Sequence, residues 1–354
     1  MTKGEAMQKL FAAAILAITL SCASAQAQKV ELALDSSEAD ASVAILQKEA
    51  AGAAVEQSDW QALFASEPYQ RLKAREASVN ASFTDDSFKT FLSGKEMIAQ
   101  AQDLERVLQT WKRVNFTKLG ERVLTYLPTG AEIHAKVYPE IKPYKNSFVW
   151  GDAGQRAIFL YLNTSMNQAQ FENKVAHECH HIGLDSLDSE QNAVLEGLSE
   201  AQKKAVRWLG GFGEGEAMLA AAGSPTVHPH AEDDQATRAR WDHDMGQFNE
   251  NLAAVQQFLL DILSGKLTEE RDIMERAQPF YGVQGAWYTV GYKMASMVEI
   301  TDGRQALLGA MIDPRKLLVL YNQAAGMQNQ QTGSHLALWS PELIQALGAR
   351  QLGQ

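Results

Sequence analysis

The chain is poor in cysteine and in positive charge. Its 354 residues include only two cysteines, Cys22 and Cys179, and acidic residues outnumber basic ones to give a formal net charge of −11. If the first 27 residues are removed as argued below, Cys179 is the last thiol, so no disulfide within the chain can stabilise it. The acidic balance and the lack of a basic stretch argue against binding to nucleic acid.

Long apolar runs are also lacking, except for one at the N-terminus. A basic start precedes an apolar run over residues 10–20, and small-residue A-x-A sites follow at 23–27. This order is typical of a secretory signal peptide. We therefore expect residues 1–27 to be cleaved and the protein to be exported, to the periplasm or as a secreted protein. Lipid attachment at Cys22 is less favoured, because Thr19 stands where a lipoprotein signal has an aliphatic residue. No other run is long enough for a stable membrane span.

The most informative run is His-Glu-Cys-His-His at residues 177–181. Two histidines four residues apart lie on one face of a helix, so both imidazoles can bind one metal ion. This is the H-E-x-x-H arrangement of zinc hydrolases, in which the glutamate takes a proton from the attacking water. We predict His177 and His181 as ligands of a Zn²⁺ cofactor and Glu178 as the general base. The alternative is a surface helix that carries three histidines by chance.

The residues around this motif predict a helix that follows a strand. Apolar residues recur at spacings of three and four from Phe171 to Ile182, residues 163–165 offer N-caps, and Gly183 is a candidate C-terminal stop. Upstream, residues 157–162 are typical of a β-strand that leads into the helix. We expect the edge of this strand to be available for pairing with an extended peptide.

A catalytic zinc site needs a third protein ligand. Three downstream glutamates compete for this position: Glu196, Glu200 and Glu214. We prefer Glu214, because the Gly-Gly-Phe-Gly run at residues 210–213 breaks a long amphipathic helix over 190–209. The next helix would then present Glu214 in its first turn. Glu196 and Glu200 are better explained as charges on a solvent-facing helix surface.

The two motifs together resemble a known group of enzymes. His-Glu-x-x-His at 177–181 followed by Glu-Gly-x-Ala at 214–217 resembles the gluzincin clan of metallopeptidases, and more closely the DUF5700 group of zinc-dependent proteases. The resemblance covers roughly residues 145–330 and implies a zincin-like catalytic domain. Other runs that carry it are residues 211–215, 220–223, 228–230 and 287–291. Some gluzincins have an aspartate four residues after the ligand glutamate; here that position is Met218, so a different group must orient the ligands.

The resemblance also implies a catalytic role for Tyr288. Gluzincins commonly place a tyrosine of a Y-x-x-G helix against the tetrahedral intermediate, and Tyr288 with Gly291 matches this pattern. A phenol held near the metal can donate a hydrogen bond to the developing oxyanion. The alternative is an ordinary core aromatic, and Tyr292 and Tyr281 are the other candidates for the role.

Five further polar residues near these motifs have open roles. His228 and His230, on a proline-containing loop, could line the cleft, orient substrate, replace a zinc ligand or be plain loop residues. We expect His180 to lie behind the ligands or on the surface rather than to bind metal. Asp185 and Asp188 could accept a hydrogen bond from the far nitrogen of a ligand imidazole, or could be ordinary turn residues.

The rest of the chain predicts an α+β, predominantly α-helical fold with a small sheet packed on the motif helix. Helical spacing is found over residues 41–54, 59–77 with an interruption at Pro68, 94–114, 235–263, 268–276, 285–300, 314–325 and 341–347. Short strands are expected over residues 123–127, 132–137, 147–150 and 157–162. We place the boundaries of an N-terminal helical region at 28–120, of a zincin-like metal-binding region at 121–223, and of a C-terminal helical region that completes the cleft at 224–354.

The sequence thus predicts a zinc metallopeptidase that hydrolyses bonds in a peptide or protein substrate by a metal-activated water. Two alternatives stay open: a zinc-dependent hydrolase of a non-peptide substrate, and a non-catalytic exported protein that binds zinc or a peptide. Glu178 argues against the second alternative, because pure binding has no use for a general base. The cleavage specificity, endo- or exopeptidase action and the oligomeric state are left open.

Overall fold

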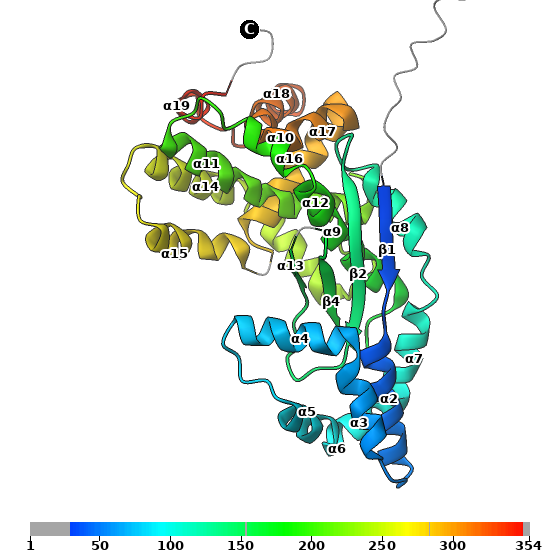
Figure 1. Cartoon of the computed structure of the whole chain (residues 1–354). Helices are drawn as coiled ribbons and strands as arrows, with labels where there is room; N and C mark the ends of the chain where they lie inside the picture. Colours follow the sequence, from blue (N-terminus) through cyan, green and yellow to red (C-terminus); the bar gives the residue numbers. More distant parts are fainter. Residues whose placement is uncertain (1–28, 153, 283, 350–354) are drawn as a thin grey trace, which may run out of the picture.

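The computed structural model in Figure 1 describes residues 29–152, 154–282 and 284–349. The expected signal peptide, residues 1–27, lies outside the described residues. Helices of the N-terminal part occupy one end of the molecule, helices of the C-terminal part occupy the other, and a small sheet lies between them (Figure 1). Across the described ranges, no helix combines the length and the hydropathy that crossing a bilayer requires.

The N-terminal part is helical apart from one strand. Its elements are β1 (Lys29–Leu34), α2 (Ser37–Ala50), α3 (Gln57–Ala65), α4 (Glu67–Ser78), α5 (Asp85–Leu92), α6 (Lys95–Ala99), α7 (Ala101–Trp111) and α8 (Phe116–Leu124). Pro68 lies in the first turn of α4, where a missing N–H costs no helical hydrogen bond. The interruption expected near Pro68 within residues 59–77 is present, as two helices that meet at Ser66.

One predicted strand is wrong. Residues 123–127 complete α8 and a following turn instead of forming a strand. The Asn115 side chain accepts a hydrogen bond from the N–H of Lys118 and caps the helix, and Leu119 and Val123 are buried one turn apart. Helical spacing of the buried residues therefore outweighs the β propensity of this run.

The sheet has four strands in the order β1-β2-β4-β3. The further strands are β2 (Glu132–Glu140), β3 (Phe148–Trp150) and β4 (Ala157–Tyr161). β2 pairs in parallel with β1 and with β4, whereas β3 pairs antiparallel with β4. β4 is therefore an inner strand, and the expectation that residues 157–162 offer a free edge is wrong; β1 and β3 are the edges. The sheet also takes β1 from the N-terminal region, where no strand was expected.

After the sheet the chain is helical. The elements are α9 (Gln168–Asp185), α10 (Asp188–Ala193), α11 (Glu200–Leu209), the 3₁₀ helix η1 (Gly210–Phe212), α12 (Gly213–Ala222), α13 (Gln235–Gly246), α14 (Phe248–Leu263), α15 (Glu270–Tyr281), α16 (Ala286–Asp302), α17 (Arg304–Ile312), α18 (Pro314–Thr332) and α19 (Pro341–Ala346). The single helix expected over 235–263 is two helices, α13 and α14, and α17 was not expected. β2 packs on α9, and the prediction of an α+β, predominantly helical fold with a small sheet on the motif helix is confirmed.

Two large hydrophobic clusters form the core, and α12 contributes to both. The N-terminal cluster includes the buried face of α9, where Trp111 of α7 stacks on Phe171 with ring centroids 4.2 Å apart. The C-terminal cluster is built around α14, α16 and α18. Ala221 of α12 belongs to the first cluster, whereas Leu219 and Ala220 belong to the second. The elements that carry the motif residues therefore lie where the two clusters meet.

A buried group of charged side chains lies in the N-terminal part. The Glu38 carboxyl accepts hydrogen bonds from the Ser42 hydroxyl (2.8 Å) and the Ile141 N–H (3.1 Å). The Lys142 ammonium lies 3.1 Å from a Glu140 oxygen, with both side chains almost fully buried. Burial, followed by the charge of Glu140, raises the pKa of Glu38 to about 8, and burial raises the pKa of Glu140 to about 7.

Candidate metal centre

α9 presents the two motif histidines on one face and buries another. Its N-cap is Asn167 rather than a residue of 163–165: the Asn167 side chain accepts from the Gln170 N–H, and the Gln170 side chain accepts in return from the Asn167 N–H, both at 2.9 Å. This reciprocal pair fixes where the helix begins. Gly183 does not end the helix, which continues to Asp185. It allows close packing instead, because a Cβ atom there would clash with the side chain of Leu127.

Glu214 lies in the first turn of α12, as predicted. The glycine run before it forms the 3₁₀ helix η1 rather than a break, and the single helix expected over 190–209 is two helices, α10 and α11. α12 crosses α16 at a pair of glycines. A Cβ atom on Gly215 would clash with the backbone nitrogen of Tyr292, and one on Gly291 would lie 2.6 Å from the carbonyl oxygen of Phe212. The two backbones are therefore in close contact, and this contact sets the position of Glu214 relative to α16.

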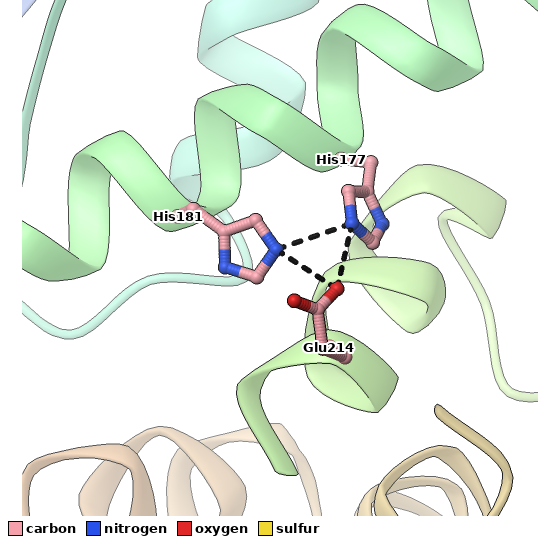
Figure 2. A group of neighbouring side chains, drawn as sticks. All are labelled: His177, His181 and Glu214. Atoms are coloured by element: carbon pink, nitrogen blue, oxygen red, sulfur yellow. Dashed lines mark hydrogen bonds and ion pairs between the residues drawn. The ribbon is translucent and has the colours of Figure 1, made fainter. Parts of the chain in front are cut away.

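The structure brings His177, His181 and Glu214 together (Figure 2). The Nε2 atoms of the two histidines are 3.1 Å apart, and Glu214 Oε2 lies 3.2 Å from His177 Nε2 and 3.3 Å from His181 Nε2. In the described residues this is the one group of His, Cys, Asp or Glu side chains arranged to hold a metal ion. Glu196 and Glu200 are exposed, and Glu200 pairs with Lys203 at 2.8 Å.

The three converging atoms fit zinc. Ligand atoms about 2.0–2.1 Å from a tetrahedral zinc ion lie about 3.3 Å from one another, close to the three separations observed. Two imidazole nitrogens and one carboxylate oxygen are also a ligand set of catalytic zinc sites, which leave one position open. With no cation between them, two ring nitrogens 3.1 Å apart can share only one proton. The geometry therefore suits a metal better than a hydrogen-bonded triad.

Contacts within the triad shift the pKa values of Glu214 and His181. Burial alone would raise the pKa of Glu214, but its hydrogen bonds with His177 and His181 outweigh burial and hold the pKa well below its ordinary range. Burial opposes a charge on His181, yet the hydrogen bond and the negative charge of Glu214 raise the His181 pKa. Glu214 is thus anionic, as a zinc ligand must be.

Glu178 and Tyr288 face one cavity beside this triad. The cavity, of about 230 Å³, is also lined by His177, Met218 and His230. Glu178 is half-buried, and within the described residues its carboxylate makes no hydrogen bond or ion pair. The Tyr288 ring lies parallel to the His177 ring, with centroids 6.2 Å apart and planes at 10°. Burial, followed by the charge of Glu214, raises the Tyr288 pKa, so the phenol keeps its proton.

The two other candidate tyrosines do not line this cavity. The Tyr292 hydroxyl donates to the Val227 carbonyl oxygen at 3.0 Å. Tyr281 is exposed and lines a separate surface groove beside Trp208. Of the three candidate tyrosines, Tyr288 is therefore the one placed in this cavity to donate a hydrogen bond to an oxyanion.

His230 lines the cavity and is held by neighbours from three parts of the chain. Its Nδ1–H donates to Asp233 at 2.7 Å, and Asp233 also accepts from the Gln170 amide at 3.0 Å. The Gln284 amide donates to His230 Nε2 at 3.1 Å. Sequence reasoning missed Asp233, although the H-x-x-D spacing was a signal. It also missed Gln284, for which no local pattern exists, because 54 residues separate it from His230. His228 instead pairs with Asp242 at 3.2 Å, outside the cavity lining.

The remaining open residues have clear positions. His180 is completely buried rather than on the surface, and burial lowers its pKa to about 3, so its ring is neutral. Asp185 forms an ion pair with Arg156. Asp188 lines a second cavity, described below. In the described part of the chain His177 Nδ1 has no hydrogen-bond partner, so neither aspartate orients that ring.

Comparison with known proteins adds one match. A family model described as “Putative zinc dependent peptidase (DUF5700)” matches residues 60–330. No curated protein and no solved structure matches the chain. The family description names zinc as its metal, in agreement with the donor set of the His177, His181 and Glu214 triad.

Proposed function

The chain belongs to the DUF5700 family, whose description names a zinc-dependent peptidase, and we propose that it is a metallopeptidase in which His177, His181 and Glu214 bind zinc and Glu178 acts as the general base. One observation carries the proposal. Three ligand atoms that converge within 3.1–3.3 Å of one another adjoin a cavity containing a carboxylate without a partner among the described residues. A site for binding zinc alone would not need that carboxylate.

Bound zinc supplies a Lewis acid that makes a water molecule acidic and polarises the substrate carbonyl. Glu178 adjoins His177 in sequence and lines the same cavity, so its carboxylate can take the proton of that water as the water attacks the carbonyl carbon. The same carboxyl can then return the proton to the leaving amine. Tyr288, protonated and stacked beside His177, can donate a hydrogen bond to the carbonyl oxygen as negative charge develops on it.

Two further expectations remain part of the proposal. The basic and apolar pattern of residues 1–27 supports export of the chain by a cleavable signal peptide. On the cavity wall, His230 Nδ1 bonds to Asp233 and Nε2 bonds to Gln284. Because both ring nitrogens have protein partners, we propose that His230 orients the substrate rather than binding zinc.

The replacement Glu178→Gln tests the proposal. It keeps the shape of the side chain and removes the base, so we expect zinc content to be unchanged and peptide cleavage to fall by about 10²- to 10⁴-fold. Zinc is measured by elemental analysis, and cleavage by mass spectrometry of a digested peptide library. The exposed Glu196→Gln is the matched control and should keep both zinc and activity. Full activity of Glu178→Gln, or no cleavage by a zinc-loaded wild-type protein, would contradict the proposal.

A further inference from the structure

A second cavity, of about 180 Å³, lies between α10, α11, α12 and the junction of α17 with α18. It shares no lining residue with the cavity that contains Glu178 and Tyr288. No step of the proposed peptidase mechanism uses it. The inference drawn from it therefore goes beyond the proposed function and does not depend on it.

The unusual residue of this cavity is Glu216. Glu216 is only 5% exposed, and in the described part of the chain its carboxyl group makes no hydrogen bond or ion pair. A carboxylate removed from water without a partner is costly, whereas a charge-assisted hydrogen bond offsets much of that cost. A ligand that brings a positively charged donor to Glu216 would therefore gain an interaction that the protein alone does not make.

The other charges around the cavity define the sign of the ligand. Asp188 adds a second carboxylate to the lining, and Arg207, which is exposed, adds one positive charge. The lining thus offers two carboxyl groups and one guanidinium group. A cationic ligand is therefore favoured, and Arg207 would weaken its binding.

The remaining walls define the body of the ligand. Leu184, Leu195, Leu209, Phe212 and Met311 form most of the apolar lining. A cavity of this volume with apolar walls and two carboxyl groups in its lining suits a short aliphatic chain that ends in a charged donor.

We propose that this cavity binds a primary ammonium or a guanidinium group carried on an aliphatic stem, with Glu216 as the main partner of the charge. Such a group occurs in free aliphatic amines and in the lysine and arginine side chains of a peptide. The shared chemistry is the same in both cases, and the experiment below distinguishes the two sources.

The test measures binding of n-butylamine and agmatine to the zinc-loaded protein by isothermal titration calorimetry. Both should bind, and n-butanol, which has the same stem without the charge, should bind about tenfold more weakly or worse. Glu216→Gln should weaken amine binding by about tenfold, Arg207→Ala should strengthen it, and the exposed Glu190→Gln should leave it unchanged. If Glu216→Gln lowers the zinc content or the fraction of folded protein, Asp188→Asn replaces it as the test variant and should also weaken amine binding.

Equal binding of butanol and butylamine, or amine binding that both carboxylate variants leave intact, would overturn the inference. So would the absence of amine binding in a protein that holds zinc and cleaves peptides, a result that leaves the proposed peptidase function standing. Digestion of a peptide library then identifies the source. A preference for lysine or arginine near the cleaved bond that Glu216→Gln removes indicates a substrate side chain, and amine binding with unchanged cleavage indicates a free amine.

Discussion

At the scale of single residues, the candidate centre depends most on Glu214, because it is the one proposed ligand that does not come from α9. Its carboxylate lies within 3.3 Å of both imidazoles because α12 packs beside α9. The low pKa that these contacts impose keeps the group charged when no metal is bound. A side chain prepared in this way loses little free energy when it coordinates a cation.

Removal of that carboxylate should release the metal. We expect Glu214→Ala to weaken zinc binding by more than the roughly 10- to 100-fold typical of changes behind the ligands. Competition with a chromogenic zinc chelator measures the affinity. Glu196→Ala is the control, since Glu196 is exposed and lies outside the triad. If only Glu196→Ala weakened zinc binding, the wrong glutamate has been assigned.

The sequence predicts the positions of residues that follow from helical spacing or from a glycine-rich run. It does not predict the positions of residues that depend on tertiary contacts. One turn of helix was sufficient to put His177 beside His181, and the glycine-rich run at residues 210–213 directed attention to Glu214. The partners of His230 were not predictable in the same way: Gln284 reaches it only because the start of α16 folds back on the loop after α12. Nothing local in the sequence encodes that approach.

At the scale of elements, the crossing of α12 and α16 aligns the proposed ligand with the proposed oxyanion donor. A methyl group on Gly291 would lie 2.6 Å from the Phe212 carbonyl oxygen and force the helices apart. We expect Gly291→Ala to lower the free energy of unfolding by about 1–3 kcal/mol, as overpacking does, and to reduce both zinc affinity and turnover. Urea unfolding and zinc competition measure the two effects.

Gly309→Ala is the control for this prediction. Gly309 lies inside α17, and a Cβ atom there would meet nothing within 4 Å. Alanine should therefore raise helix stability by up to about 1 kcal/mol without a change in zinc affinity. Equal behaviour of the two variants would show that the crossing does not position the site.

The elements that sequence reasoning misjudged have identifiable causes. In β1 the apolar Val30, Leu32 and Leu34 alternate with less apolar residues, which is a strand signal, but the run directly follows the expected cleavage site and was assigned to a helical region. In residues 123–127 the β-branched and aromatic residues favour a strand. Helix α8, which Asn115 caps, includes the first two residues of this run. In both cases a neighbouring element determines the local structure: β1 pairs with β2, and residues 123–124 continue α8.

At the scale of the whole molecule, the buried Glu38 makes stability depend on pH. Its folded-state pKa of about 8 exceeds the ordinary value of 4.5, so between these limits this carboxyl group binds more protons in the folded chain than in the unfolded chain. The contribution of Glu38 to the free energy of unfolding should therefore fall as pH rises from about 5 to 8, by up to about 1.4 kcal/mol per pH unit. Glu38→Gln should flatten this slope and be the more stable protein at pH 8.

Urea unfolding at pH 5.5 and pH 8 checks this expectation. The exposed Glu96→Gln should keep the wild-type slope. A difference in stability between the wild type and Glu38→Gln that is the same at both pH values would mean that Glu38 is ionised in the folded protein throughout this range.

The position of α12 between the two hydrophobic clusters has one more consequence. Two proposed ligands come from a helix rooted in one cluster, and the third comes from a helix that the other cluster also holds. A cation bound by all three side chains would connect the two hydrophobic clusters. Without the ion, each cluster would keep its apolar interior but the contact between the clusters would be weaker. The supply of metal would then determine how rigidly the N-terminal and C-terminal parts are held together.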